Sequence, residues 1–136
     1  MEAGVLHLQP EGLHKNPAYS QAVAVSGPVT TVYVGGQDAV DADGKVVGAG
    51  DLKAQSRQAL RNVQAAVVAA GGRLEHVIKW NVLLVEGQSV QSGFEAFVEM
   101  WPADAAPPVV TVAFVSGLGN PDFLVEIEAV AVIPLG

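Results

Sequence analysis

Cysteine is absent from this 136-residue chain. Without thiols the protein has no disulfide, no thiolate metal site and no cysteine nucleophile. Long apolar runs are missing as well, since none approaches the ~20 residues that a membrane-spanning helix needs. The N-terminus also lacks the basic and then apolar profile of a signal peptide. These absences predict a cytoplasmic protein.

Positive charge is scarce. Seven Lys and Arg stand against 14 Asp and Glu, so the net charge is −7, and the basic residues do not cluster. Nucleic-acid-binding proteins use clustered positive charge to displace counterions from phosphates. We therefore expect a small molecule and other copies of the chain as partners, and neither nucleic acid nor a membrane.

Charged residues make up only 15% of the chain, whereas hydrophobic residues make up 50%. A small monomer does not normally expose that much apolar surface, so an oligomer is expected. The length fits one domain, residues 1–136, and no repeat or low-complexity tract divides it.

Hydrophobic periodicity predicts an α+β layout of about six strands and two helices. Two helices cover only one face of such a sheet, so self-association through the other face would bury its Val and Leu side chains. Asp51 and Gly71-Gly72 mark the start and the end of the first helix. The expected strands are Val5–Leu8, Tyr19–Ser26, Thr30–Val34, Val77–Val85 and two strands joined by a short turn within Pro107–Pro134, and the expected helices run from Asp51 to about Ala70 and from Ser89 to Trp101.

Odd-numbered and even-numbered residues of the last strand point to opposite faces of the sheet. Val125, Ile127 and Ala129 share an apolar face, whereas Glu126 and Glu128 share the opposite face. Carboxylates in an apolar row are costly unless they reach water, a partner or a ligand. Because alternating glutamates on a strand are unspecific, two interpretations stay open: acid–base groups in a cleft, or ordinary carboxylates at a rim or interface.

The remaining polar residues suggest no further site. The three histidines fall in separate segments without metal-ligand spacing, so no metal site is expected. Residues Asp38–Lys45 have the composition of a turn and lack the ligand spacing of a calcium loop. Arg57 and Arg61, one helical turn apart, are interpreted as solvated or paired at the rim of the helix.

Six segments, spread over nearly the whole chain, match the motifs of one known family in the right order. They are Pro-Ala-Tyr-Ser-Gln-Ala-Val (17–23), Val-Tyr-Val-Gly-Gly-Gln (32–37), Gln-Ser-Arg-Gln-Ala-Leu-Arg-Asn-Val (55–63), Ala-Ala-Gly-Gly (69–72), Val-Ile-Lys (77–79) and Leu-Val-Glu-Ile-Glu-Ala-Val-Ala (124–131). Together they resemble the RidA/YjgF/L-PSP family of reactive-intermediate (enamine and imine) deaminases.

The resemblance implies a chorismate-mutase-like α+β subunit, with a mixed sheet of about six strands and two helices on one face. Such subunits form a homotrimer with three clefts between neighbouring subunits. Family members hydrolyse small 2-enamine or 2-imine acids to a 2-keto acid and ammonia, and they need no metal or organic cofactor.

Carried over by position, the resemblance also implies a set of site residues. Glu126 is the glutamate that positions the attacking water, and Tyr19 is the tyrosine of the cleft. The Ser-Gly backbone corner of the family becomes Gly35-Gly36 here. Gln91 takes the place of a polar residue on the second helix.

The chain departs from the family where a substrate carboxylate would bind. The family reads Pro-Ala-Arg and then Ser or Thr, whereas this chain reads Pro-Pro-Val-Val-Thr (107–111). Val109 therefore replaces the carboxylate-binding arginine in a stretch that also supplies Thr111 to the substrate. No Lys or Arg follows Lys79, so the last strands hold no replacement. Losing such a bidentate contact costs about 2–4 kcal/mol, a factor of tens to hundreds in binding.

Two functions follow from this departure. One is a cofactor-free hydrolase or deaminase that acts on a small imine, enamine or related compound without a clamped carboxylate, rather than on 2-aminoacrylate. The other is a trimer that binds small molecules or partners without catalysis. Ribonuclease activity, which the L-PSP part of the family name suggests, is the least expected because the net charge is −7.

Overall fold

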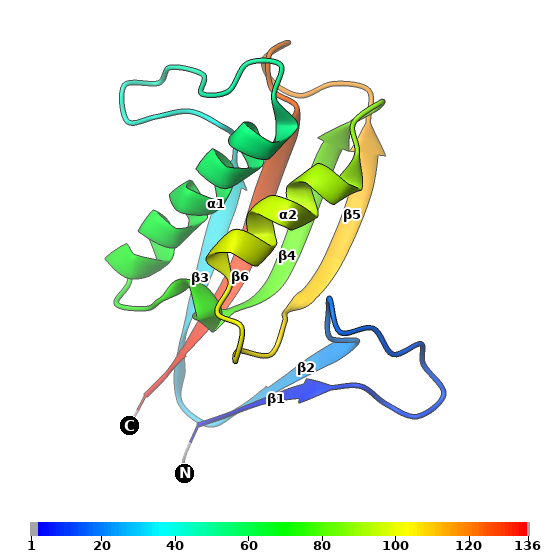
Figure 1. Cartoon of the computed structure of the whole chain (residues 1–136). Helices are drawn as coiled ribbons and strands as arrows, with labels where there is room; N and C mark the ends of the chain where they lie inside the picture. The colour runs from blue at the N-terminus through cyan, green and yellow to red at the C-terminus, as the bar shows by residue number, and fades with distance from the viewer. Residues whose placement is uncertain (1–2, 136) are drawn as a thin grey trace.

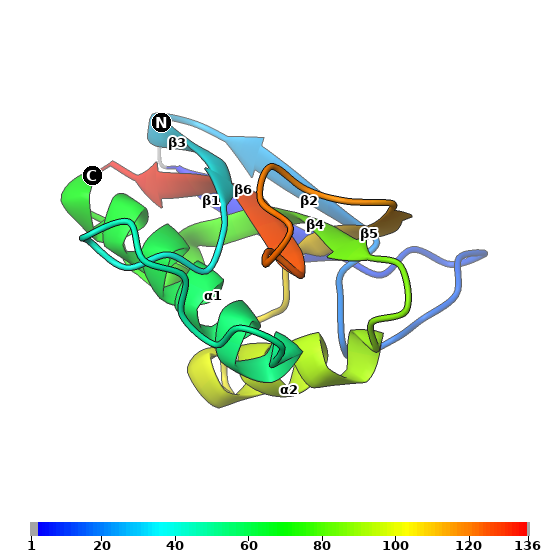
Figure 2. The same ribbon diagram turned by 90° about the horizontal axis from the view of Figure 1, so that it is seen from above.

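The computed structural model describes residues 3–135. Its main sheet has four strands in the order β3-β6-β4-β5. Figures 1 and 2 show both α-helices on one face of this sheet, and we call the opposite face the open face. The elements are β1 (Gly4–Leu8), β2 (Ala22–Ser26), β3 (Val29–Gln37), α1 (Leu52–Ala69), the 3₁₀ helix η1 (Leu74–His76), β4 (Val77–Val85), α2 (Val90–Met100), β5 (Val109–Val115) and β6 (Val125–Pro134).

The expected sheet of about six strands is divided in two. β1 and β2 pair antiparallel with each other and form a separate two-stranded sheet, which lies beyond one end of the main sheet in Figure 1. Gly27, with φ of 80°, and Pro28 turn the chain sharply between β2 and β3. Ser20 links the small sheet to the start of β5, because its N–H donates to Pro108 O at 3.1 Å and its hydroxyl donates to Pro107 O at 2.6 Å.

The expected start of the second strand at Tyr19 is wrong. Tyr19 lies in a turn, and β2 begins at Ala22. Asn16 makes this turn, because its side-chain Oδ1 accepts a hydrogen bond from Ala18 N–H at 2.8 Å. Such local side-chain bonds favour turns over extended backbone.

The last two strands of the chain are not neighbours in the sheet. β4 lies between them and pairs parallel with β5 and antiparallel with β6. The near-continuous apolar sequence of β4 suits this inner position, and its helix-facing residues Trp80 and Leu84 are buried.

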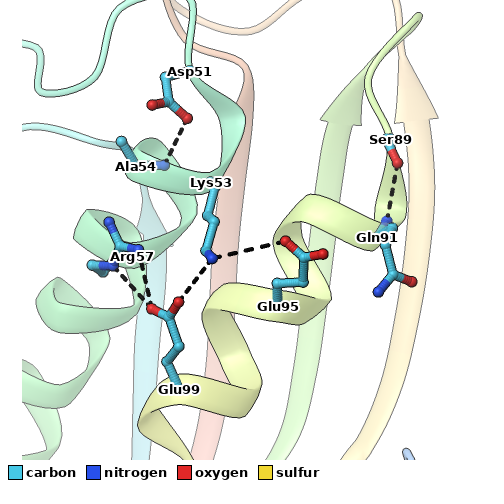
Figure 3. Close-up of polar contacts among 8 residues, drawn as sticks. All are labelled: Asp51, Lys53, Ala54, Arg57, Ser89, Gln91, Glu95 and Glu99. Carbon is cyan, nitrogen blue, oxygen red and sulfur yellow. Dashed lines mark hydrogen bonds and ion pairs between the residues drawn. The ribbon is translucent and has the colours of Figure 1, made fainter.

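Both α-helices begin where capping residues predict. Asp51 caps α1 by accepting from Ala54 N–H, and Ser89 caps α2 by accepting from Gln91 N–H (Figure 3). Neither helix is long and apolar enough to cross a membrane, which is true of every helix within residues 3–135. The core lies between α1 and the sheet and includes Leu60, Val63, Val67, Trp80, Leu84, Val125, Ile127 and Ala129.

Candidate functional site

A pair of carboxyl groups, Glu126 and Asp38, lies on the open face where β3 meets β6. A β-bulge at Gly35-Gly36 shifts the register between the two strands. Gly36 passes so close to Glu126 that a Cβ on it would lie 2.7 Å from Glu126 Cδ and Oε2, whereas a Cβ on Gly35 would meet nothing within 4 Å. Gly36 has no positive φ. Glycine is therefore needed at this position for space, and it allows the carboxylate to lie against the backbone.

Asp38 is the titratable partner in this pair. Burial, the negative charge of Glu126 and a side-chain hydrogen bond with Glu126 raise the pKa of Asp38 from 3.8 to about 6. A hydrogen bond between two carboxyl groups requires that one of them carries a proton. Asn62 on α1 holds this segment, because its Nδ2 donates to Asp38 O at 3.0 Å and to Val40 O at 2.9 Å. Near pH 6 the pair can both donate and accept a proton.

A polar hollow of about 380 Å³ lies further along the open face. Its polar side chains are those of Tyr33, Lys79, Asn81 and Glu128, and Gly35 forms part of its wall. Asn81 Nδ2 donates to Glu128 Oε1 at 2.7 Å. Glu128 is thus paired with an amide, so the two glutamates of β6 differ: Glu126 contacts an acid and Glu128 contacts an amide.

Val109 and Thr111 lie on the open face of β5 but away from Glu126 in the same chain. Val109 pairs with Lys79 of β4, whereas Glu126 pairs with Leu83. These two positions on β4 are four residues apart, roughly 13 Å at the rise of a strand. The structure therefore places Lys79, and not Glu126, beside the position of the missing arginine.

Arg57 does not replace the arginine either. Its Nη2 lies 3.1 Å from Glu99 Oε2, and Glu99 Oε1 forms a second ion pair with Lys53 Nζ at 2.9 Å (Figure 3). Hydrogen bonds from Lys53 and Arg57 lower the pKa of Glu99. These residues join α1 to α2 on the helix side of the sheet, so the prediction of a rim-paired Arg57 is confirmed.

Tyr19 and Gln91 lie on the other side of the sheet from Glu126. Both line a cavity of about 350 Å³ between α2 and the sheet. Ile127, the neighbour of Glu126 on β6, lines this cavity as well, which is consistent with the alternation of side chains along a strand. In one chain the predicted site residues are therefore divided between two faces: Gly35, Gly36, Val109, Thr111 and Glu126 belong to the open face, and Tyr19 and Gln91 belong to the helix side.

Sequence reasoning missed Asp38. Its segment was predicted to be a turn, and the turn is present: Asp41 Oδ1 accepts from Asp43 N–H at 2.9 Å and from Lys45 N–H at 3.0 Å. The available signal was the Gly-Gly pair directly before Gln37, because glycine inside a strand often marks a bulge or a close approach of the backbone. A bulge there carries Asp38 to Glu126. No three His, Cys, Asp or Glu side chains gather as metal ligands anywhere in residues 3–135.

Comparison with known proteins agrees with this architecture. The family described as Endoribonuclease L-PSP matches residues 12–133. The RutC family protein PH0854 of Pyrococcus horikoshii is 35% identical over 113 residues, which cover 83% of this chain and 85% of that protein. The chain belongs to the RidA/YjgF/L-PSP family.

Solved structures of this family share the fold. YyfB of the conserved Rid protein family from Yersinia pestis matches with a TM-score of 0.81 at 28% identity, over 93% of this chain and 97% of that one. RidA from the Antarctic bacterium Psychrobacter sp. PAMC 21119 matches with a TM-score of 0.69 at 30% identity, over 93% and 98% of the two chains. The family and the α+β fold predicted from the sequence are confirmed.

Proposed function

We propose that this protein is a cofactor-free hydrolase of small neutral or cationic imines and enamines. The observation that carries the proposal is the carboxyl pair of Asp38 and Glu126. Burial of Asp38 and the negative charge of Glu126 raise the pKa of Asp38 to about 6, which lies near the pH at which a cell works. An acid and a base held side by side are the groups that imine hydrolysis needs.

The reaction adds one water to the C=N bond. Glu126 accepts a proton from the water while the water oxygen bonds to the imine carbon. The π electrons of C=N move to nitrogen, which takes the proton of Asp38. Glu126 then gives its proton to nitrogen while Asp38 takes the proton of the new hydroxyl group, and the C–N bond breaks as the C=O bond forms. The products are a carbonyl compound and ammonia, or an amine when the nitrogen carries a substituent. An enamine enters the same sequence after its carbon is protonated.

The charges of the open face favour substrates without a carboxylate. Glu126, Glu128 and Asp38 lie on this face, and the cation Lys79 lies in its polar hollow beside Glu128. This excess of carboxylates attracts a protonated imine and repels an anion. Val109, in place of the arginine, offers a carboxylate no charge-assisted contact. We therefore place 2-imino acids outside the preferred substrates.

A site that includes Tyr19 and Gln91 needs more than one copy of the chain. These residues lie on the helix side, whereas Glu126 lies on the open face. A neighbouring subunit whose Tyr19 turn and α2 reach the edge of the open face would join the two sets. The open face also exposes a large side chain, Tyr33, which is 81% accessible. We propose that the protein works as a cytoplasmic homotrimer with its sites between subunits.

A second candidate function is non-catalytic binding of a small molecule. The missing arginine favours this function, because a cleft without the carboxylate-binding arginine can still bind small molecules without converting them. It predicts that a ligand raises the melting temperature without being consumed. Ribonuclease activity has no support from charge, since the net charge is −7 and the basic residues do not cluster.

The test compares two imines made in situ. A flavin-dependent amine oxidase supplies an imine without a carboxylate, and an amino-acid oxidase supplies a 2-imino acid. Carbonyl release is measured with and without the purified protein. We expect acceleration of the first imine, little of the second, and loss of the acceleration in Glu126→Gln. No acceleration of either imine would refute hydrolysis and leave the binding function.

A further inference from the structure

The cavity between α2 and the sheet is separate from the carboxyl pair. It has a volume of about 350 Å³, which lies at the lower end of the range for small-molecule sites, roughly 300–1,000 Å³. Among the described residues, its wall contains aromatic and aliphatic side chains from five elements and no charged side chain. Prominent among them are Leu60 of α1, Trp80 of β4, Phe94 and Phe97 of α2, Val112 of β5 and Ile127 of β6.

Two buried polar groups in this wall have no hydrogen-bond partner within residues 3–135. They are the hydroxyl of Ser56 on α1 and the indole Nε1–H of Trp80. Ser56 is 1% exposed and Trp80 is 4% exposed. Gly93 of α2, which also lines the cavity, lies next to this hydroxyl, since a Cβ on it would lie 3.5 Å from Ser56 Oγ. Unpaired buried donors are rare in folded proteins and call for an explanation.

The indole N–H of Trp101, which lies in the same region, has a hydrogen-bond acceptor. Trp101 packs edge-on against Trp80 with ring centroids 6.4 Å apart, and its Nε1 donates to Ala105 O at 3.2 Å. Of the two tryptophans in the chain, the one that lines the cavity is therefore the one with an unused donor.

We propose that this cavity binds a neutral, largely apolar molecule of about one ring that carries a hydrogen-bond acceptor, such as a ketone or an amide carbonyl. The apolar wall excludes ionised ligands, because a buried charge without a partner is very costly. The acceptor oxygen pairs with Trp80 Nε1–H or the Ser56 hydroxyl. Both atoms lie just beneath the wall, so a small displacement of α2 accompanies binding.

Tyr19 and Gln91, which the proposed intersubunit site also uses, line this cavity, but the binding proposed here needs neither the carboxyl pair nor hydrolysis. Ile127 faces the cavity and its neighbour Glu126 faces away from it, so the sheet separates the two sites. Glu126→Gln should abolish imine hydrolysis and leave binding in the cavity unchanged. The failure of one proposal is therefore distinguishable from the failure of the other.

The experiment compares 4-fluoroacetophenone with 1-ethyl-4-fluorobenzene, which has nearly the same shape but no acceptor. ¹⁹F NMR titrations measure the affinity of both probes for the wild type, Trp80→Phe and the matched control Trp101→Phe. We expect saturable binding with a dissociation constant on the order of 1 mM or tighter. The ketone should bind roughly three- to tenfold more tightly than the hydrocarbon. Trp80→Phe should reduce this preference, and Trp101→Phe should keep it.

A second variant tests the position of the probes. Val112→Phe fills the cavity from β5 and should weaken both probes at least tenfold, while circular dichroism reports whether the fold is kept. If that variant does not fold, the methyl NMR signals of Leu60 and Ile127 in the wild type take its place, and they should shift on titration. Absence of saturable binding, or equal affinity for the two probes, would overturn the proposal. So would binding that Val112→Phe leaves intact or that shifts neither methyl signal.

Discussion

Replacing Gly36 by alanine should displace the Glu126 carboxylate while the sheet stays folded. The new Cβ would lie 2.7 Å from Glu126 Cδ and Oε2, and ordinary contacts begin at 3.4 Å, so these atoms must move by at least 0.7 Å. They form the end of a flexible side chain. The cost in stability should therefore be about 1 kcal/mol or less, below the 1–3 kcal/mol that is typical of an overpacked core.

The displacement should be visible in both chemistry and titration. A shift of about 1 Å in a reacting group costs up to roughly 10²-fold in rate, so we expect imine hydrolysis to fall by about ten- to a hundredfold. The pKa of Asp38 should fall only part of the way from about 6 towards 3.8, because burial, its largest cause, remains. Steady-state rates, urea unfolding and carboxyl-carbon NMR titration measure the three effects.

Gly35→Ala is the matched control for this prediction. It introduces the same methyl group one residue away in the same bulge, where a Cβ meets nothing within 4 Å. Its stability should stay within about 0.5 kcal/mol of the wild type, with no change in the titration of Asp38. Equal effects of the two substitutions, or an unchanged pKa of Asp38 in Gly36→Ala, would refute the close packing of Gly36 against Glu126.

Three further outcomes are expected. Because the folded-state pKa of Asp38, about 6, lies above its ordinary 3.8, its contribution to stability is complete below pH 3.8 and is lost as the pH rises through about 6. Asp38→Asn should remove this slope from urea unfolding measured between pH 4 and 7. Gln55→Ala should cost about 2–4 kcal/mol in thermal or urea unfolding. The reason is that buried Gln55 donates to Gly48 O and Asp122 O and accepts from Leu124 N–H; a cost under 1 kcal/mol would contradict this role. Val109→Arg should increase the affinity for carboxylate-bearing imines by tens of times in competition assays, and no gain would mean that the surrounding open face has also diverged.

Local sequence patterns were sufficient where neighbouring residues determine the structure. Asp51 and Ser89 cap the two helices as their residue types predict. The alternation in β6 correctly placed Glu126 and Glu128 on the face away from the helices. Hydrophobic periodicity supplied the number of helices and the approximate number of strands, and the resemblance to the family implied the same layout.

Patterns were insufficient where contacts are long-range or depend on packing. Asp38 meets Glu126 across 88 residues of sequence because a bulge shifts the register of β3, and no local periodicity reports such a shift. Tyr19 lies outside its expected strand because the side chain of Asn16 accepts a hydrogen bond from the backbone N–H of Ala18 and forms a turn. Gln55 and Ser56 are buried within α1 although both are polar, since only the packed structure shows which helix positions face another element.

The central claim, that the carboxyl pair performs imine hydrolysis, is tested most directly by the rate of carbonyl release from a neutral imine in Glu126→Gln. The control is Glu86→Gln, which changes an exposed carboxylate beyond the end of β4. The loss of a general acid–base group costs typically 10²–10⁴-fold. We predict a fall of at least about 100-fold for Glu126→Gln and an unchanged rate for Glu86→Gln, with both variants folded. Equal rates for the wild type and Glu126→Gln would contradict the claim.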